Sequence, residues 1–199
     1  MNTQPAPTRQ TDLAAEFAAI AELLCRCTVQ TKSGRTGFGS GIIWHPDGLI
    51  ITNAHVAQRP TATVRLWDGR VFEAAVAARD PVRDLAALTL KATDLPAATI
   101  GDSDVLRVGE LVLAVGNPVG LVGALTTGII SRLGSMETPN RQAWVMADVR
   151  LSPGNSGGPL ADAQGRVIGV NSMIVGGLAL AVPSNAVKRF LLISGAEAA

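Results

Sequence analysis

Most of this sequence consists of short apolar or alternating runs, each bounded by turn-forming residues. The runs are separated by Gly, Pro, Asp or Asn and include GSGIIW, LIITN, ATVRLW, VFEAAVAA, LAALTL, ELVLAVG, TTGIISRL, AWVMADV, RVIGVNSMI and LALAVP. Runs of this length and spacing are typical of β-strands joined by tight turns. So many short strands favour a sandwich or barrel over alternating βα units, because βα units need longer helical segments between strands. We therefore expect an all-β protein.

A polar segment divides these predicted strands into two sets of similar size. It reads KATDLPAATIGDSDVLRVGE and covers residues 91–110. We expect one structural unit over about 25–100 and a second over about 106–183, both within a domain spanning 25–199. The chain has 199 residues, 47% of them hydrophobic, and this is enough for a substantial core.

Helical periodicity is confined to the two ends of the chain. Residues 1–24 are predicted to be a polar tail followed by an amphipathic helix, and a closing helix is predicted over about 184–193. Ser184 is suited to cap the second helix. Apolar side chains recur at helical spacing in both segments: Leu13, Phe17, Ile20 and Leu24 in the first, and Val187, Phe190 and Leu191 in the second.

The charge balance argues against a polyanionic partner. Lys and Arg number 17 and Asp and Glu 16, with no run of like charge, so neither nucleic acid binding nor membrane insertion is expected. Glu16 and Glu22 interrupt the only candidate leader or spanning segment, which favours the cytoplasm. A mature exported protein bearing an added Met1 would look the same, and its compartment would be the periplasm.

The cysteines and histidines do not suggest a metal site. Cys25 and Cys27 fall in a segment that reads as a strand, where side chains two residues apart point the same way and suit a disulfide poorly. We expect free buried thiols. His45 and His55 follow different predicted elements, so neither a metal nor a cofactor is expected.

A serine in a glycine-rich turn is the candidate nucleophile. Ser156 lies in GNSGGPL, and a serine needs a base to act at neutral pH. His45, in WHPDGLI, reads as a solvated turn residue. His55, in LIITNAHVA, follows an apolar run and is the better candidate base.

A histidine base needs a carboxylate that fixes its tautomer, and Asp84 is the best placed. It precedes the apolar run LAALTL, where a bare carboxylate would be costly without a partner. Alternatively, Asp84 caps its own turn or pairs with Arg83 or Arg79. Asp80 and Asp68 lie in plainer turns.

The order His, Asp, Ser, within TNAHV, DPVRDLAAL and GNSGGPL, resembles the chymotrypsin-like fold and, more closely, the protease domain of the bacterial HtrA/Deg family. The segments GSGIIWHPDGLIITNAHV, IGDSDVLRVGELVLAVGNPVGL, TTGIISRLG and LALAVPSNAV also match, so the similarity runs from about residue 29 to 187. The resemblance implies two six-stranded barrels, with the catalytic residues in the cleft between them. The implied activity is a trypsin-like serine endopeptidase that forms an acyl-enzyme and acts on unfolded or extended polypeptide.

The resemblance also implies a role for each site residue. Ser156 would attack the carbonyl, His55 would be the general base and then acid, and Asp84 would orient His55. The oxyanion hole would comprise Gly154 and Ser156 with Asn155 between them. The substrate would pair with a strand edge at Ser172, whose alternative roles are an ordinary strand-end serine or support of the triad. A small apolar pocket would give cleavage after small or aliphatic residues, and its positions would be Leu151, Met173 or Ile174, and Leu180.

Several features bear on specificity and regulation. Arg150 would favour acidic substrates if it reached the pocket; otherwise it pairs with Asp148 or faces solvent. Asn155 carries no charge that a cleaved N-terminus would have to pair, so no zymogen cleavage is expected. Any regulation would act through residues 134–142 and the oxyanion turn. Pro153 restricts that turn, which predicts a preorganised site.

The sequence ends shortly after Phe190, so we expect no PDZ domain of the kind usual in the family. Trimers are common among HtrA-like domains, and the helix containing Phe17 is a candidate for assembly. Two other functions are open at this point. One is a processing protease dedicated to one partner protein, and the other is a non-catalytic peptide-binding or chaperone-like module on the same fold.

Overall fold

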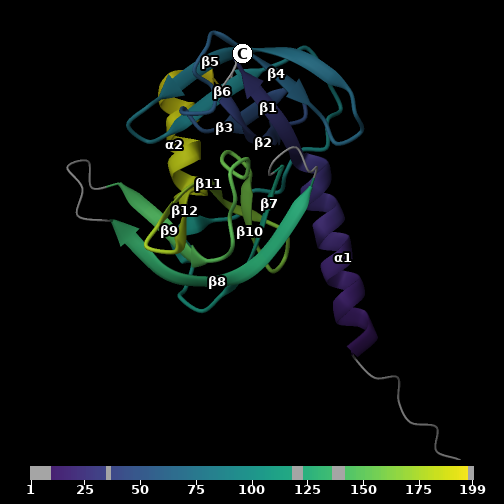
Figure 1. Ribbon diagram of the computed structural model, residues 1–199, viewed down its shortest axis with the longest axis vertical. Coiled ribbons are helices and arrows are strands. Elements are labelled where there is room, and N and C mark those ends of the chain that lie inside the picture. The colour runs from purple at the N-terminus through teal and green to yellow at the C-terminus, as the bar shows by residue number, and fades with distance from the viewer. Residues whose placement is uncertain (1–9, 35–36, 118–122, 136–141, 197–199) are drawn as a thin grey trace, which may run out of the picture.

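The chain folds into two closed antiparallel β-barrels with a helix at each end (Figure 1). The computed structural model describes residues 10–34, 37–117, 123–135 and 142–196. Each barrel has six strands, so the predicted all-β fold of two six-stranded barrels with terminal helices is confirmed. The N-terminal tail and most of the predicted regulatory loop fall at residues 1–9 and 136–141, outside the described residues.

The two barrels share one topology. The first closes in the order β1-β2-β3-β6-β5-β4, and the second closes in the equivalent order β7-β8-β9-β12-β11-β10. The first contains β1 (Thr28–Ser33), β2 (Gly37–His45), β3 (Leu49–Thr52), β4 (Thr61–Arg65), β5 (Val71–Asp80) and β6 (Leu85–Thr89). The second contains β7 (Leu111–Gly116), β8 (Ala124–Ser135), β9 (Ala143–Asp148), β10 (Pro159–Asp162), β11 (Val167–Val175) and β12 (Leu178–Pro183).

The helices are α1 (Gln10–Cys27) and α2 (Ser184–Ser194), and the polar connection between the barrels contains a 3-10 turn, η1 (Ser103–Val105). The expectation that Cys25 and Cys27 lie in a strand is wrong, because both belong to the last turn of α1. The helical spacing continues from Leu24 to Cys27, and the side chains of Leu24 and Cys27 are buried. The helix ends where the Thr28 hydroxyl donates to the Leu24 carbonyl at 2.6 Å.

Both cysteines are free thiols. Burial raises the pKa of Cys27 to about 12, and burial also raises that of Cys25. A thiol held in its protonated form is a weak nucleophile and a weak metal ligand. Cys27 therefore contributes to packing in the apolar cluster between the barrels, and the Cys25 thiol lies against Gly123, next to β8.

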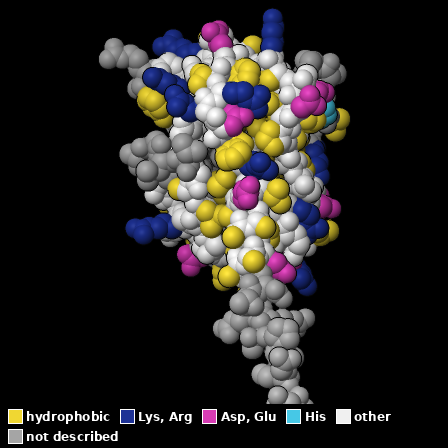
Figure 2. All heavy atoms as spheres, turned by 90° about the vertical axis from the view of Figure 1, so that its right-hand side faces the viewer, with side chains coloured by type: hydrophobic (Ala, Val, Ile, Leu, Met, Phe, Trp, Pro, Cys, Tyr) yellow, Lys and Arg dark blue, Asp and Glu magenta, His cyan; other side chains and the backbone are white. Residues whose placement is uncertain are grey.

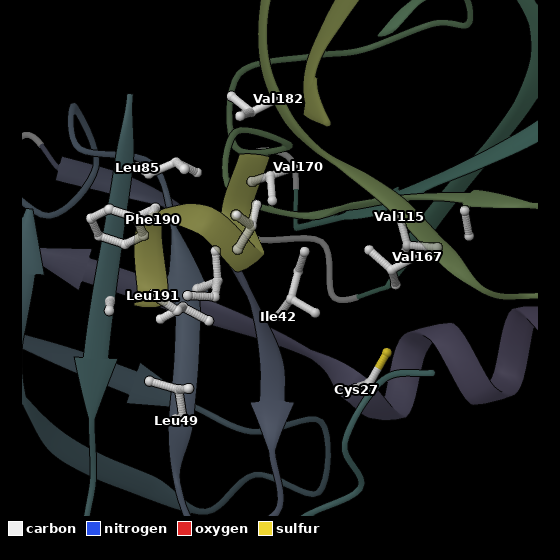
Figure 3. Close-up of a cluster of buried hydrophobic side chains, with 14 of the residues drawn as sticks. Cys27, Ile42, Leu49, Leu85, Val115, Val167, Val170, Val182, Phe190 and Leu191 are labelled. Carbon is white, nitrogen blue, oxygen red and sulfur yellow. The ribbon is translucent and has the colours of Figure 1, made fainter. Parts of the chain in front are cut away.

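An apolar cluster joins the two barrels and α2. Figure 3 shows Ile42, Leu49 and Leu85 from the first barrel facing Val115, Val167, Val170 and Val182 from the second, with Phe190 and Leu191 of α2 among them. Each barrel also has its own interior cluster. Because close-packed interiors resist displacement, the shared cluster fixes the position of one barrel against the other. A site built from both barrels is thereby held in place.

The surface shows no concentration of one charge on the face drawn in Figure 2, where apolar, basic and acidic side chains are mixed. This distribution agrees with a net charge of +1. Among the described residues, no helix combines the length and the hydropathy that crossing a bilayer would require.

Candidate active site

His55 and Asp84 come together because their strands are neighbours. His55 follows the end of β3 and Asp84 precedes the start of β6, and these strands pair antiparallel with Thr52 opposite Ala86. His55 Nδ1 lies 2.9 Å from each Asp84 carboxylate oxygen, and the His55 backbone N–H donates to Oδ1 at 3.1 Å. Asp84 therefore contacts the histidine rather than a neighbouring arginine.

The two arginines considered as alternative partners have other contacts. Arg83 pairs with Asp80 at 2.6 Å. Arg79 donates from Nε and Nη2 to the backbone carbonyl of Ala54, at 3.0 and 2.8 Å. His45 is exposed, as the sequence predicted, but it is the last residue of β2 rather than part of the turn, and it accepts a hydrogen bond from the Asp47 N–H.

Asp84 is held in its ionised form. Burial raises the pKa of its carboxyl group, but hydrogen bonds from His55 and Ser172 outweigh that effect and leave the pKa below its ordinary value. The Ser172 hydroxyl donates to Oδ2 at 2.5 Å, and the Asp84 side chain is only 15% exposed. A carboxylate in this setting fixes the position of the His55 ring and keeps its proton on Nδ1.

The lowered pKa of Asp84 predicts a pH-dependent contribution to stability. A carboxyl group with a lower pKa in the folded state than in the unfolded chain stabilises the fold above its unfolded pKa. That contribution is lost as the pH falls through the lowered folded pKa. We expect the difference in unfolding free energy between the wild type and Asp84→Asn to change over this acidic interval, measured by urea unfolding from pH 7 to pH 3. A difference that is constant with pH would contradict the lowered pKa.

Ser156 sits in the turn between Asp148 and β10, on the second barrel. Its hydroxyl donates to the backbone carbonyl of Ser172 at 3.0 Å. Ser172 thus contacts Asp84 through its hydroxyl and Ser156 through its carbonyl, so the structure brings all three predicted triad residues to one place. In the described hydrogen bonds, the Ser156 hydroxyl is bonded to Ser172 and not to His55.

The oxyanion turn has two backbone donors that bond to no described protein acceptor. The N–H groups of Asn155, Gly157 and Gly158 donate to the carbonyls of Ser152, Asn171 and Asn155 respectively. Those of Gly154 and Ser156 have no such partner in the described part of the chain. Gly154 has a φ of 106°, a left-handed conformation that favours glycine. Asn155 is buried, and its own N–H is directed back to the turn.

Ser40 holds this turn against the first barrel, and sequence reasoning missed it. Its N–H donates to the Ser156 carbonyl at 2.8 Å, and its hydroxyl donates to the Gly154 carbonyl at 2.7 Å. Asn117 donates to the same hydroxyl at 2.9 Å. Ser40 is fully buried, so these bonds are shielded from water. The small residues around Ser40 in GFGSG were the only signal of this contact.

Asn53 was also missed, and it connects the His55 turn to the Asp84 turn. Its side-chain amide donates to the Asp84 backbone carbonyl at 2.9 Å. Its own carbonyl accepts from the N–H groups of Val56 and Ala57 at 3.1 Å each, which closes the turn that carries His55. Asp84 has a φ of 56°, uncommon for a residue other than glycine, so its backbone needs this support.

The predicted substrate-binding residues differ in accessibility. Ser172, Met173 and Ile174 lie on β11, and the last two are 43% and 53% exposed. Leu180 is only 2% exposed and packs in the shared core, and Leu151 is partly buried against the second barrel. Residues 173–175 pair with β12 on one side, whereas the β10 register ends at Val170. Among the described residues, no strand pairs with the other edge of this β11 segment, which leaves that edge open to an extended chain.

Arg150 is exposed, and within the described residues it forms no ion pair with Asp148. Its backbone carbonyl accepts a hydrogen bond from the Thr126 hydroxyl at 2.8 Å. Within the described ranges, no group of three or more His, Cys, Asp or Glu side chains is arranged to hold a metal ion.

The chain is similar to known proteins in both sequence and fold. Residues 39–170 match the family model for the trypsin-like peptidase domain. A putative serine protease HhoB from Synechocystis is 44% identical over 156 residues, which cover 74% of this chain and 38% of that protein. A probable periplasmic serine endoprotease DegP-like from Chlamydia pneumoniae is 39% identical over 162 residues, covering 77% of this chain and 33% of that protein.

A solved structure has the same architecture. It is the HtrA-type protease AlgW with decapeptide, which superimposes with a TM-score of 0.81 at 29% identity and covers 89% of this chain and 67% of that one. The present chain spans about a third to two fifths of the length of these two curated relatives.

Proposed function

Because this chain belongs to the trypsin-like peptidase domain family and is homologous to HtrA-type serine proteases, we propose that it is a serine endopeptidase acting through His55, Asp84 and Ser156. The observation that carries the proposal is the pair of hydrogen bonds through Ser172, which link the partly buried Asp84 carboxylate to the Ser156 turn. His55 bonds to the same carboxylate.

The proposed reaction begins with Ser156. With the Nδ1 proton directed at Asp84, Nε2 of His55 is left as the base. Rotation of the Ser156 side chain away from Ser172 would bring its hydroxyl toward Nε2, a movement consistent with the loose catalytic hydrogen bonds of substrate-free enzymes. The serine oxygen attacks the scissile carbonyl carbon as its proton passes to His55, which then protonates the departing amine. Water releases the acyl group by the reverse sequence.

The oxyanion and the substrate backbone have separate supports. The N–H groups of Gly154 and Ser156 are free of protein acceptors in the described residues and would stabilise the negative oxygen of the tetrahedral intermediate. The open edge of β11 at residues 173–175 would pair with an extended polypeptide. Strand pairing of this kind selects an unfolded or extended substrate.

Specificity is proposed to rest on Met173 or Ile174, accessible apolar side chains that follow Ser172 and point to opposite faces of β11. Leu180, opposite Met173 on β12, and Leu151 are the other apolar positions proposed for the pocket. Such a surface favours small or aliphatic residues before the scissile bond. Arg150 is exposed in the segment between β9 and the oxyanion turn, and a preference for acidic residues there would assign it to the pocket.

Reduced casein and a peptide library test the proposed breadth of substrate. We expect turnover of both, with mass spectrometry locating the cuts after Val, Ala or Leu. An enzyme that reacts with an active-site serine probe but cleaves neither would instead be a processing protease dedicated to one partner. Failure to react with the probe would favour a non-catalytic peptide-binding module.

Assembly and compartment are further parts of the proposal. α1 exposes Leu13 and Leu23, which are 58% and 62% accessible, and these are candidates for contacts in a trimer. The relative from Chlamydia is described as periplasmic, which agrees with the exported alternative rather than with the cytoplasm expected from the sequence.

Asn53→Ala is expected to lower kcat by about tenfold to a hundredfold with KM little changed, because small misplacements of catalytic groups are costly. The variant loses the hydrogen bond to the Asp84 carbonyl and leaves the left-handed backbone at Asp84 without that support. Steady-state kinetics on one peptide substrate measures the effect. Loss of a buried hydrogen bond also lowers stability by about 1–3 kcal/mol.

Asn185→Ala is the control for that variant. Asn185 also donates a side-chain hydrogen bond, to Asp102 at 2.6 Å, but it lies at the start of α2. Its kcat is expected to equal that of the wild type. A kcat for Asn53→Ala that matches the wild type at a temperature where both are folded would show that Asn53 does not position the triad.

A further inference from the structure

A groove of about 650 Å³ lies between the oxyanion turn and the outer surface of the first barrel. Pro153 and Gly154 form one wall. The other wall is formed by β1, β2, β4 and β5, with Lys32, Phe38, Arg65 and Val71 among the lining residues. Phe38 and Val71 are 58% and 53% exposed, so the groove offers apolar surface that the described part of the chain leaves uncovered.

The strand register places both cations on this one surface. Lys32 stands opposite Phe38 on β2 and Thr63 on β4, and Arg65 stands opposite Val71 on β5. Lys32 and Arg65 are therefore diagonal neighbours across β1 and β4, close enough to face one ligand group. Lys32 Nζ lies 5.1 Å from the centre of the Phe38 ring.

The groove is electrostatically one-sided. Of its described lining residues, two are basic and none is acidic. Neither Lys32 nor Arg65 takes part in the ion pairs of the described residues. Glu73 is opposite Thr63 on β4 and is therefore a diagonal neighbour of Arg65, but it does not line the groove. Arg70 is paired with Asp68 at 2.8 Å and does not line the groove.

The groove and the open edge of β11 flank Ser156 on different sides. Ser156 bonds through its hydroxyl to Ser172 on β11 and through its carbonyl to Ser40 on β2. If a substrate pairs with β11 up to the scissile bond, the chain beyond that bond leaves past Gly154 and β2. That path leads into the groove.

We propose that this groove binds the substrate on the leaving-group side of the scissile bond and selects an acidic residue there. The inference rests on the proposed endopeptidase function. Lys32 lies on β1 opposite Phe38, and Phe38 is two residues before Ser40 on β2. Strand geometry therefore separates Lys32 from Ser40 by about 8 Å. An extended chain covers this distance in two to three residues, so the preference falls on the second or third residue after the cut. Phe38 and Val71 contact the apolar stem of that residue.

Fluorogenic peptides with one shared sequence before the cut test the proposal. They carry Glu, Gln or Lys at the second and third positions after it, and mass spectrometry verifies that the same bond is cleaved. We expect kcat/KM for the Glu peptide to exceed that for the Lys peptide by about tenfold, as two partly exposed ion pairs allow. The ratio should shrink as salt is added, because exposed charges are screened.

Variants assign the preference to the two cations. In Lys32→Gln/Arg65→Gln the ratio is expected to fall to about one, and in Lys32→Glu/Arg65→Glu to invert. Lys91→Gln, at an exposed lysine outside the groove, should leave it unchanged. Equal rates for the Glu and Lys peptides in the wild type, or a ratio that survives in the double Gln variant, would overturn the inference.

A peptide anilide separates this inference from the function beneath it. Its small leaving group does not reach the groove, so the wild type and the double Gln variant should hydrolyse it equally. Equal anilide hydrolysis without charge selection rejects the groove assignment alone. Failure of the wild type to hydrolyse either the anilide or the peptides would reject the endopeptidase function, and the groove assignment with it.

Discussion

Ser156→Ala is expected to lower kcat/KM for peptide hydrolysis by about 10⁴- to 10⁶-fold, the range found when a triad nucleophile is removed. The alanine retains the backbone of the oxyanion turn, because the turn is held by Ser40 and by backbone hydrogen bonds rather than by the Ser156 hydroxyl. KM and the melting temperature should therefore stay close to those of the wild type. Single-substrate kinetics and a thermal melt measure both effects.

Ser152→Ala is the matched control for this loss. Ser152 is exposed in the same loop, four residues before Ser156, and its carbonyl rather than its hydroxyl contributes a hydrogen bond to the turn. Its activity should be unchanged. Activity in Ser156→Ala within tenfold of the wild type would show that another group is the nucleophile.

Asp84→Asn is expected to lower kcat by about 10⁴-fold, because an amide no longer fixes the His55 tautomer that leaves Nε2 free as the base. Asparagine suits this position, since Asp84 has a φ of 56° and asparagine tolerates left-handed backbone better than alanine does. The backbone contact from Asn53 to the Asp84 carbonyl also remains possible. The variant should therefore still fold, although without the stabilisation from the ionised carboxylate, and the loss of about 10⁴-fold should be one of catalysis.

Asp80→Asn distinguishes the two acids of this turn. Asp80 pairs with Arg83 and accepts from two backbone N–H groups, but it does not contact His55. We expect its kcat to lie within a few-fold of the wild type, as for most surface ion pairs. If Asp80→Asn lost as much activity as Asp84→Asn, the orientation of His55 by Asp84 would not be the cause.

The sequence predicted the elements whose patterns are local. Alternating runs, turn residues and the helical spacing of Phe17 and Phe190 were enough for the strands and helices, and the resemblance supplied the two barrels. Cys27 was misassigned because three apolar residues near a helix end fit a strand as well as a helix. The bond from Thr28 to Leu24 marks the end of the helix, and the pairing of Thr28 with Ile42 marks the start of β1.

The residues that support the site were less predictable because their roles depend on contacts distant in sequence. Ser40 bonds to Gly154 across 114 positions, and Asn53 bonds to Asp84 across 31. Neither residue differs in type from an ordinary turn or strand residue. The link from Ser172 to both Asp84 and Ser156 likewise requires the two barrels to be packed against each other.

The most direct test of the central claim, that the His55–Asp84 pair activates Ser156, is mass-spectrometric mapping of a fluorophosphonate adduct. We expect a single modified peptide containing residues 154–160, with the phosphonyl group on Ser156, and labelling at least about 10³-fold slower in His55→Ala. An adduct on any other residue, or equal labelling rates in the wild type and His55→Ala, would contradict it.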